Sequence, residues 1–250
     1  MKKKLAAALA CRNGSTRLYG KPLQNIDVKN GITVLDYLLD WLEKITVIET
    51  SVLGIAEGQE NLDYVDFADR RGIPYIIGSE KDVLERLIQC GEKAGATDVL
   101  RRSSESPFGY YEAIEEAWEV HSKNNYDFSC INDVVDGVSI EIISMEALKY
   151  SHKNGEERHR SEFCSLYIRE NKDKFRINYI DVPDAIKRTD LRLTIDNPED
   201  LIVCRAVYEH FKDKAPLISP IEIVEYLDQN LFYKELVDQY VEEGLKTMYL

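Results

Sequence analysis

Three basic side chains and two glycines follow the first apolar run of the chain. That run, Leu5–Cys11, is short and ends at a cluster of Gly, Ser and Thr, which is typical of a buried strand in a parallel sheet. The residues that could do chemistry there are Arg12, Gly14, Arg17, Gly20 and Lys21. Guanidinium groups match phosphate oxygens, and lysine adds a mobile point charge. Because ligands of open α/β sheets bind where loops leave the strands, this loop is predicted to hold a triphosphate.

Two carboxylates follow later strands in the same way. Glu105 lies in a serine-rich turn after the predicted strand Thr97–Arg101, and Asp196 ends the apolar run Leu191–Ile195 just before a predicted helix. A carboxylate in such a place is a good ligand for a hard cation beside a phosphate site. The other interpretations are a surface turn for Glu105 and a helix cap for Asp196.

The basic loop is neither of two common phosphate-binding motifs. The spacings G-x-x-x-x-G-K-[ST] and G-x-G-x-x-G are both absent from it. A solvated basic turn between a strand and a helix is the alternative to a triphosphate site.

Alternating apolar segments organise the chain around these residues. The predicted strands are Leu5–Cys11, Ser51–Ala56, Ile73–Ile77, Thr97–Arg101, Asp127–Ile131, Asp136–Ile143 and Leu191–Ile195. The predicted helices are Val34–Leu42 with Thr33 as its cap, Asn61–Arg70, Lys81–Ala94, Tyr110–Lys123, Met145–His152, Asn197–Phe211, Pro220–Gln229 and Leu231–Thr247. This order predicts an α/β fold of Rossmann-like type, with a mostly parallel sheet and helices on both faces.

The middle of the chain departs from that rhythm. Residues 1–250 are expected to form one α/β domain, in which 132–180 is a small inserted subdomain because its short strands do not continue the βα alternation. The run Leu191–Ile195 is expected to return the chain to the main sheet.

Charge and composition restrict the partners. The chain of 250 residues has a formal net charge of -13, yet its first 26 residues carry six basic and no acidic side chains. An acidic protein with one basic mouth suits a small polyanion better than a nucleic acid, which would need an extended basic face. The five scattered cysteines show no metal-binding spacing, and no apolar run approaches the roughly 20 residues that cross a bilayer. We expect a cytoplasmic protein without a membrane segment.

Several motifs resemble one enzyme family. The pattern R-x-x-S-x-R-L-x-G-K-P-L at 12–23 resembles the opening signature of the sugar-activating cytidylyltransferases, which include the acylneuraminate, 3-deoxy-manno-octulosonate and SpsF-type enzymes. The segment from Gly78 to Leu84 is similar to the SpsF-type Gly-Ser-Glu-Asp-Asp-Val-Leu. The segment 191–200 is similar to the family's Leu-Arg-Leu-Thr-Val-Asp-Thr-Pro-Glu-Asp. In the SpsF-type run Arg-Val-Thr-Gly-Asp-Cys-Pro-Leu, the glycine and aspartate positions correspond here to Ser104 and Glu105.

The resemblance implies a fold of the nucleotide-diphospho-sugar transferase type and a reaction. An acceptor oxygen would attack the α-phosphorus of CTP in the presence of Mg²⁺, and pyrophosphate would leave. The implied acceptor is a sugar acid such as a 3-deoxy-2-keto nonulosonate or octulosonate, made into a CMP-sugar for surface polysaccharide or glycan synthesis. A sugar phosphate, polyol phosphate or phosphonate is the rival acceptor. Because Glu105 departs from the family aspartate, a catalytically silent nucleotide-binding protein is the alternative from another class. The family also implies a homodimer, whose contacts and acceptor pocket would lie in the inserted stretch.

The same resemblance assigns roles to individual residues. The implied catalytic residues are Arg12, Lys21, Glu105 and Asp196, of which Glu105 and Asp196 would hold the metal. The implied nucleotide-binding residues are Ala10, Arg12, Asn13, Gly14, Ser15, Arg17, Lys21, Ser79 and Asp82. The implied acceptor-binding residues are Glu141, His159, Arg160, Glu162 and Arg188.

Some of these assignments have structural alternatives. Ser79 and Asp82 could instead cap a helix, and His159 with Arg160 could be a solvated charge cluster at a helix start. Arg192 alternates with its neighbours along the predicted strand and is expected on a structural face.

Overall fold

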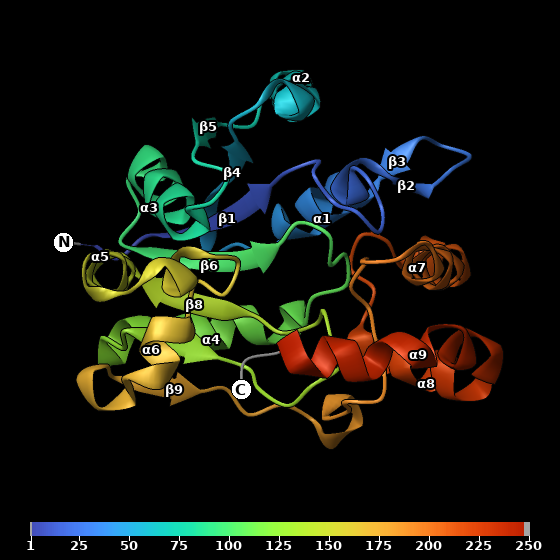
Figure 1. Cartoon of the computed structure of the whole chain (residues 1–250). Coiled ribbons are helices and arrows are strands. Elements are labelled where there is room, and N and C mark those ends of the chain that lie inside the picture. The colour runs from blue at the N-terminus through green and yellow to red at the C-terminus, as the bar shows by residue number, and fades with distance from the viewer. Residues whose placement is uncertain (1, 248–250) are drawn as a thin grey trace.

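A seven-stranded sheet forms the centre of the molecule in the computed structural model, which describes residues 2–247 and the side chains of residues 2–242 (Figure 1). The strand order is β5-β4-β1-β6-β8-β7-β9. The strands are β1 (Leu5–Cys11), β4 (Ile48–Ala56), β5 (Tyr75–Gly78), β6 (Asp98–Ser103), β7 (Phe128–Cys130), β8 (Glu141–Ser144) and β9 (Ile177–Tyr179), and a separate antiparallel pair is formed by β2 (Asn25–Asp27) and β3 (Ile32–Thr33). Within the seven-stranded sheet β8 runs antiparallel to both neighbours and the other pairs are parallel, so the prediction of a mostly parallel sheet is confirmed.

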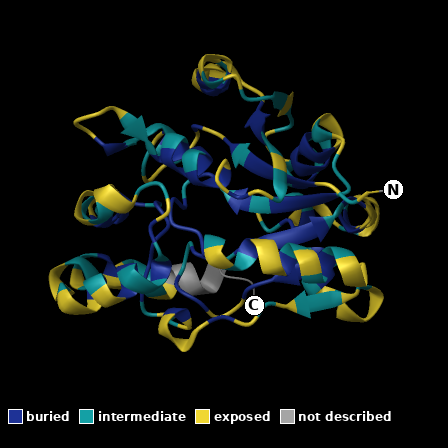
Figure 2. Ribbon diagram, turned by 180° about the vertical axis from the view of Figure 1, so that it is seen from behind, coloured by how far each residue is buried: buried dark blue, intermediate teal, exposed yellow. Residues whose placement is uncertain are grey.

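Helices cover both faces of this sheet. They are α1 (Val34–Leu42), α2 (Leu62–Arg71), α3 (Val83–Ala94), α4 (Ile114–Asn124), α5 (Met145–Asn154), α6 (Leu166–Glu170), α7 (Pro198–Phe211), α8 (Pro220–Gln229) and α9 (Leu231–Thr247). The short 3-10 helices are η1 (Lys21–Leu23), η2 (Gln59–Asn61), η3 (Tyr111–Ala113), η4 (Glu157–Arg160), η5 (Lys172–Lys174), η6 (Asp184–Ile186) and η7 (Lys212–Lys214). Figure 2 shows buried strands and helices whose outer faces are exposed.

The alternation of side chains along β1 explains the two layers. Leu5 and Leu9 belong to the core that includes α1, α2, α4 and α7, whereas Ala8 belongs to a second core with α3, α5 and α6. Successive residues of a strand point to opposite faces of its sheet, so a strand with apolar residues at every position is buried on both faces. The burial of β1 on both faces therefore agrees with the predicted α/β fold, in which helices pack on both faces of the sheet.

Local signals set the start of α1. The Thr33 hydroxyl accepts a hydrogen bond from the Asp36 backbone N–H at 3.0 Å, and the Asp36 carboxylate accepts one from the Thr33 N–H at 3.1 Å. This reciprocal capping box satisfies two backbone donors that a helix start leaves without intrahelical partners. The predicted cap at Thr33 and the helix Val34–Leu42 are confirmed.

The prediction that Leu191–Ile195 is a strand of the main sheet is wrong. This segment makes one isolated parallel bridge, Asp136↔Arg192, and no ladder with β6 or its neighbours is found in the described residues. The segment is nevertheless buried, since it packs beneath the cavity described below. Short buried apolar runs look alike in sequence whether or not they join a sheet.

The stretch 132–180 shares the main sheet. It supplies β8 between β6 and β7, and it supplies β9 at the sheet edge beside β7. The sequence predicts a strand at Asp136–Ile143. The observed strand, β8, begins only at Glu141 and is shorter. A role of this stretch in acceptor binding or dimerisation stays a prediction.

Within residues 2–247, no helix combines the length and apolar character needed to cross a bilayer.

Candidate active site

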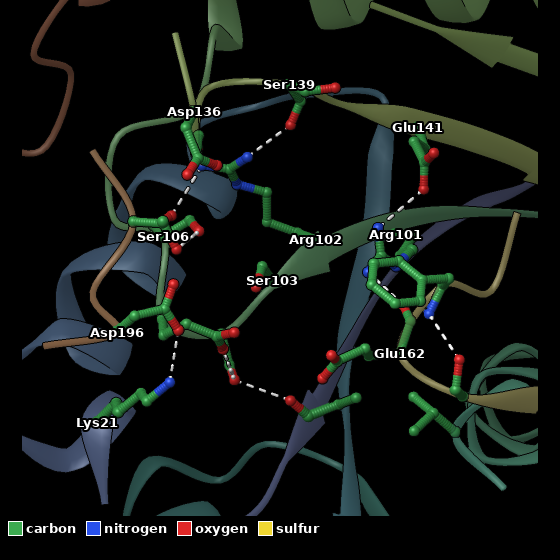
Figure 3. Close-up of a pocket in the computed structure, with 18 of the residues that line it drawn as sticks. Lys21, Arg101, Arg102, Ser103, Ser106, Asp136, Ser139, Glu141, Glu162 and Asp196 are labelled. Carbon is green, nitrogen blue, oxygen red and sulfur yellow. Dashed lines mark hydrogen bonds and ion pairs between the residues drawn. The ribbon is translucent and has the colours of Figure 1, made fainter. Parts of the chain in front are cut away.

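A cavity of about 1120 Å³ opens at the carboxyl ends of β1 and β6 (Figure 3). From β1 the chain goes first to β4 and β5 on one side and then to β6 on the other, so the direction of the connections reverses between β1 and β6. Such a reversal leaves a crevice in which open α/β sheets bind their ligands. Figure 1 shows the arrowheads of β1 and β6 pointing toward the side where α7 lies. The basic loop and the turn that carries Glu105 both open into this crevice.

The basic loop is held in place by its own backbone and by α2. The Asn13 N–H donates to Asn61 Oδ1 at 2.7 Å, and Tyr64 donates its hydroxyl hydrogen to the Arg12 carbonyl at 3.1 Å. The Gly20 N–H donates to the Asn13 carbonyl at 3.3 Å, with Gly20 at a φ of 59° that favours glycine. Asn13 is buried and does not line the cavity, so its side chain shapes the loop, and its nucleotide contact stays a prediction.

Asp196 is the point on which the loop's cations converge. Its Oδ1 lies 2.6 Å from Lys21 Nζ and 3.1 Å from an Arg17 terminal nitrogen, and its Oδ2 lies 2.8 Å from Arg192. Burial by itself would raise the pKa of Asp196, but Lys21 and the two arginines lower it below the usual range. The structure thus brings predicted triphosphate ligands and a predicted metal ligand together as an ionised cluster.

Glu105 borders the same cavity from the turn after β6. The Ser104 hydroxyl lies 2.8 Å from the Ala10 carbonyl and 3.1 Å from the Glu105 carboxylate. The Ile195 N–H donates to the Glu105 carbonyl at 3.0 Å, which ties this turn to the residue before Asp196. The serine at the family's glycine position therefore connects β1 to the Glu105 turn, and both predicted metal ligands face one cavity.

Other members of the predicted nucleotide set line the wall of the cavity. These are Ala10, Arg12, Gly14 and Ser15. Arg12 is half exposed and makes only long ion pairs, 3.8 Å to Glu162 and 4.0 Å to Glu80. Its guanidinium is therefore available to an incoming anion.

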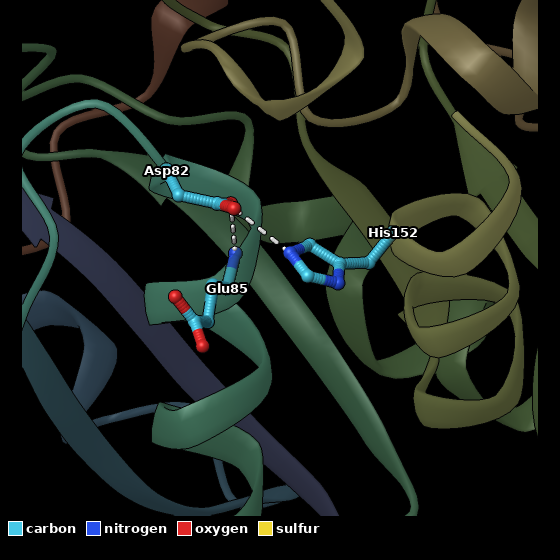
Figure 4. Close-up of side chains that lie close together, drawn as sticks. All are labelled: Asp82, Glu85 and His152. Carbon is cyan, nitrogen blue, oxygen red and sulfur yellow. Dashed lines mark hydrogen bonds and ion pairs between the residues drawn. The ribbon is translucent and has the colours of Figure 1, made fainter. Parts of the chain in front are cut away.

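Ser79 and Asp82 do not line the cavity. Asp82 caps α3, because its Oδ1 accepts a hydrogen bond from the Glu85 N–H at 2.8 Å. Its Oδ2 lies 2.8 Å from His152 Nε2 on α5 (Figure 4). Ser79 in turn accepts a hydrogen bond from the Asp82 N–H at 3.3 Å. The helix-cap interpretation accounts for both residues, and the His152 contact links α3 to α5.

Three of the five predicted acceptor residues are engaged elsewhere and do not line the cavity. His159 is buried, with Nδ1 accepting from the Glu156 N–H at 2.8 Å and Nε2 lying 2.8 Å from Glu170. Arg160 donates to the backbone carbonyl of His152, and Arg188 pairs with Asp190 and Asp228. The partners of these three side chains lie outside the cavity, which sequence spacing alone does not reveal.

Glu141 and Glu162 do line the cavity, and Glu141 is accompanied by two arginines that the sequence analysis did not select. The Glu141 carboxylate is almost fully buried and lies 2.9 Å from Arg101, 3.0 Å from Arg169 and 2.7 Å from the Ser165 hydroxyl. Burial by itself would raise the pKa of Glu141, but Arg101 and Arg169 outweigh it and lower the pKa. Arg101, Arg169 and Lys172 give this end of the cavity three positive charges, and we call it the basic end, although Glu141 and Glu162 add carboxylates to its lining.

Sequence reasoning could have found only part of that basic end. Arg101 lies at the end of a predicted strand, and its position beside the cavity follows from the same rule that singled out Glu105. Arg169 lies in α6 and reaches the cavity only because α6 packs near β8, so it carries no local signal.

Gly137 lets the Asp136 segment lie directly on the segment before Asp196. Its φ is 91°, and a Cβ atom placed there would lie 2.7 Å from backbone atoms of Leu193 and Thr194. We expect Gly137→Ala to lower the free energy of unfolding by at least ~2 kcal/mol, since it combines a strained φ with a backbone overlap. Urea titration measures this loss.

Gly72→Ala is the matched control for that prediction. Gly72 has a φ of 66°, but nothing lies within 4 Å of its missing Cβ. This variant should show only the cost of the left-handed conformation, about 1 kcal/mol. Equal losses in the two variants would contradict the proposed overlap at Gly137.

Comparisons with known proteins identify the family of this chain. The model of a family described as cytidylyltransferase matches residues 6–240. The spore coat polysaccharide biosynthesis protein SpsF of Bacillus subtilis is 26% identical over 227 residues, which cover 89% of this chain and 93% of that protein.

Two solved structures show the same fold. A cytidylyltransferase from Leptospira borgpetersenii has a TM-score of 0.81 at 20% identity and covers 93% of this chain and 97% of its own. A CMP:2-keto-3-deoxy-manno-octonic acid synthetase complexed with CTP has a TM-score of 0.62 at 14% identity. The match covers 83% of this chain and 99% of that chain.

Proposed function

The chain belongs to the cytidylyltransferase family and is a CTP-dependent nucleotidyltransferase, and we propose that it transfers CMP from CTP to a sugar acid with release of pyrophosphate. The proposed acceptors are 3-deoxy-2-keto nonulosonates or octulosonates. The likeness to SpsF favours a role in making a surface polysaccharide or glycan.

The contact of Arg17 and Lys21 with Asp196 carries this proposal. Lys21 is only 13% exposed, yet it lies in the cavity wall where a phosphate oxygen could replace or join the carboxylate. Nucleotidyl transfer needs alignment and charge neutralisation more than covalent chemistry. Arg12, Arg17 and Lys21 would hold the triphosphate and keep its α-phosphorus facing the acceptor.

Glu105 and Asp196 would hold Mg²⁺, and their chemistry fits that ion. Both offer carboxylate oxygens to the cavity, and Mg²⁺ is commonly bound by one or two carboxylates together with substrate phosphates. When bound, the ion would neutralise charge on the α-phosphate and acidify the attacking hydroxyl.

The basic end of the cavity supports an anionic acceptor. Arg101, Arg169 and Lys172 line it, and the carboxylate of Glu141 lies between the two arginines. A carboxylate of a sugar acid fits such an end because guanidinium forks bind carboxylates in two parallel hydrogen bonds. A phosphate or phosphonate is also an anion, so the rival acceptors remain to be separated by experiment.

A pyrophosphate-release assay with each nucleoside triphosphate tests the proposal. The acceptor panel contains 3-deoxy-manno-octulosonate, N-acetylneuraminate, a hexose 1-phosphate, a polyol phosphate and an alkylphosphonate. We expect turnover with CTP and a keto sugar acid. Turnover with GTP or UTP but never CTP would overturn the nucleotide assignment, and turnover confined to phosphates or phosphonates would overturn the sugar-acid assignment.

A catalytically silent nucleotide-binding protein is the alternative that Glu105 motivates. Such a protein would give a heat of CTP binding in calorimetry but would form no product. Turnover that is present in the wild type and absent from Glu105→Ala rejects it.

We also propose that the protein is a homodimer in the reducing environment of the cytosol. All five cysteines are buried and unpaired, which suits a compartment where thiols stay reduced. Light scattering at the peak of a gel-filtration run distinguishes a dimer from a monomer of 28.8 kDa.

A further inference from the structure

Asp136 places a third carboxylate in the cavity, beside the two that the sequence singled out. It lies between β7 and β8, and its side chain is 20% exposed in the cavity wall (Figure 3). The Asp136 N–H donates to the Leu191 carbonyl at 3.1 Å, and its own carbonyl accepts from the Leu193 N–H at 2.7 Å. Two backbone hydrogen bonds therefore fix the position of this residue against the segment that ends at Asp196.

A single buried arginine holds Asp136 and Asp196 side by side. Arg192 contacts Asp136 Oδ2 with one terminal nitrogen at 2.8 Å and Asp196 Oδ2 with the other at 2.8 Å, while its Nε lies 3.1 Å from Asp200. Asp136 Oδ1 has no hydrogen-bond partner among residues 2–242. One oxygen of this carboxylate is thus committed to Arg192, and the other is open.

The two neighbouring carboxylates have opposite electrostatic surroundings. Asp196 is contacted by Lys21, Arg17 and Arg192, which lower its pKa. At Asp136, burial together with Asp196, Asp200 and Glu105 outweighs Arg192 and raises the pKa to about 6. Arg102, from β6, is a further charged group close to Asp136. Paired acids whose surroundings separate their pKa values are typical of sites in which one acid stays ionised and the other exchanges a proton.

We propose that Asp136 is a catalytic residue, whose open Oδ1 accepts a hydrogen bond from the attacking hydroxyl of the acceptor and then takes its proton. The acceptor oxygen bonds to the α-phosphorus of CTP as the bond from that phosphorus to the pyrophosphate oxygen breaks. The proton passes to Asp136 and from there to solvent, and the electron pair of the broken bond leaves with pyrophosphate. The inference rests on the proposed transfer to a hydroxyl and does not depend on which hydroxyl compound is the acceptor.

Asp136→Asn tests this role, since the amide keeps the shape of the side chain and an oxygen that can accept from Arg192. With 3-deoxy-manno-octulosonate as the acceptor, we expect kcat to fall about 10²- to 10⁴-fold. The CTP affinity measured by calorimetry should change by less than about threefold, because nucleotide binding does not use the open oxygen. In the wild type, kcat/KM for the acceptor should fall toward acidic pH as Asp136 becomes protonated, and this limb should be missing from the variant.

Asp213→Asn is the control. Asp213 is exposed in η7 and does not line the cavity. This variant should turn over at the wild-type rate.

Two outcomes would overturn the proposal. One is an Asp136→Asn enzyme that turns over within about threefold of the wild type, since a positioned base contributes far more than that. The other is a loss of turnover that is matched by an equal loss of CTP affinity or by unfolding in a thermal melt, which would give Asp136 a structural role only. If no acceptor of the panel reacts, the proposed function is contradicted, and this result is distinct from a failure of the role proposed for Asp136. Asp136 is then tested on the slow Mg²⁺-dependent cleavage of CTP to CMP by water, which needs the same proton acceptor.

Discussion

Replacement of Asp196 by asparagine is expected to lower the turnover number about 10³-fold. The carboxylate is the common partner of Lys21, Arg17 and Arg192, and its pKa is held low, so it is a permanent negative charge in the cavity. Asparagine keeps the volume but removes that charge. Mg²⁺ would lose an anionic ligand, and the three cations would lose the group that arranges them.

The measurement is initial-rate pyrophosphate release over a range of Mg²⁺ concentrations at saturating CTP. Binding of Mn²⁺ with CTP, followed by electron paramagnetic resonance, should weaken in parallel and gives a readout apart from turnover. Glu199→Gln is the matched control, since it removes one carboxylate from the first turn of α7 without a described contact to the cavity. Near wild-type turnover of Asp196→Asn at low Mg²⁺ would count against a metal role for this residue.

Removing the buried carboxylate of Glu141 should cause the largest loss of stability. Its oxygens contact Arg101, Arg169 and the Ser165 hydroxyl, and its side chain is 3% exposed. Glu141→Ala leaves two guanidinium groups close together without their shared anion. Breaking a buried ion pair in this way typically costs about 3–5 kcal/mol, which corresponds to a fall in Tm on the order of 10 °C for a chain of this size. Chemical denaturation and differential scanning calorimetry measure the two quantities.

The pH dependence of this loss has a definite sign. The pKa of Glu141 is lower in the folded protein than its ordinary value of 4.5, so the ionised carboxylate stabilises the fold above that value. As the pH falls through the folded pKa, the carboxylate is protonated and its contribution disappears. The difference in unfolding free energy between wild type and Glu141→Ala should be constant from about pH 8 to pH 5 and shrink below about pH 4.

Glu157→Ala is the control for that series. Glu157 is exposed and has no described ion pair, so its loss should change stability by less than about 0.5 kcal/mol at any pH. A Glu141→Ala variant as stable as this control would mean that water replaces the carboxylate between the two arginines.

Local sequence signals predict most of the helices and strands and the chemistry of the basic loop. Thr33 and Asp36 lie three residues apart, so the capping box that begins α1 is a local event that the sequence reveals. The apolar run Leu5–Cys11 and its basic continuation also act locally, because a strand followed by a glycine-containing loop needs no distant partner to be recognised. The α/β alternation follows from the same short-range patterns, and the two-sided burial of β1 agrees with it.

Contacts between distant segments determine which charges share a site. Lys21 and Asp196 are 175 positions apart and meet at 2.6 Å because the loop after β1 and the segment that ends at Asp196 border the same cavity. Asp136 joins them through a backbone bridge to Arg192, whereas His159 contacts Glu170 and Arg188 pairs with Asp190 and with Asp228 of α8. Residue type states what a side chain can bind, but strand order, register and helix packing decide which partner it meets. For this reason Asp82 caps α3, whereas Asp136 presents an open carboxylate oxygen to the cavity.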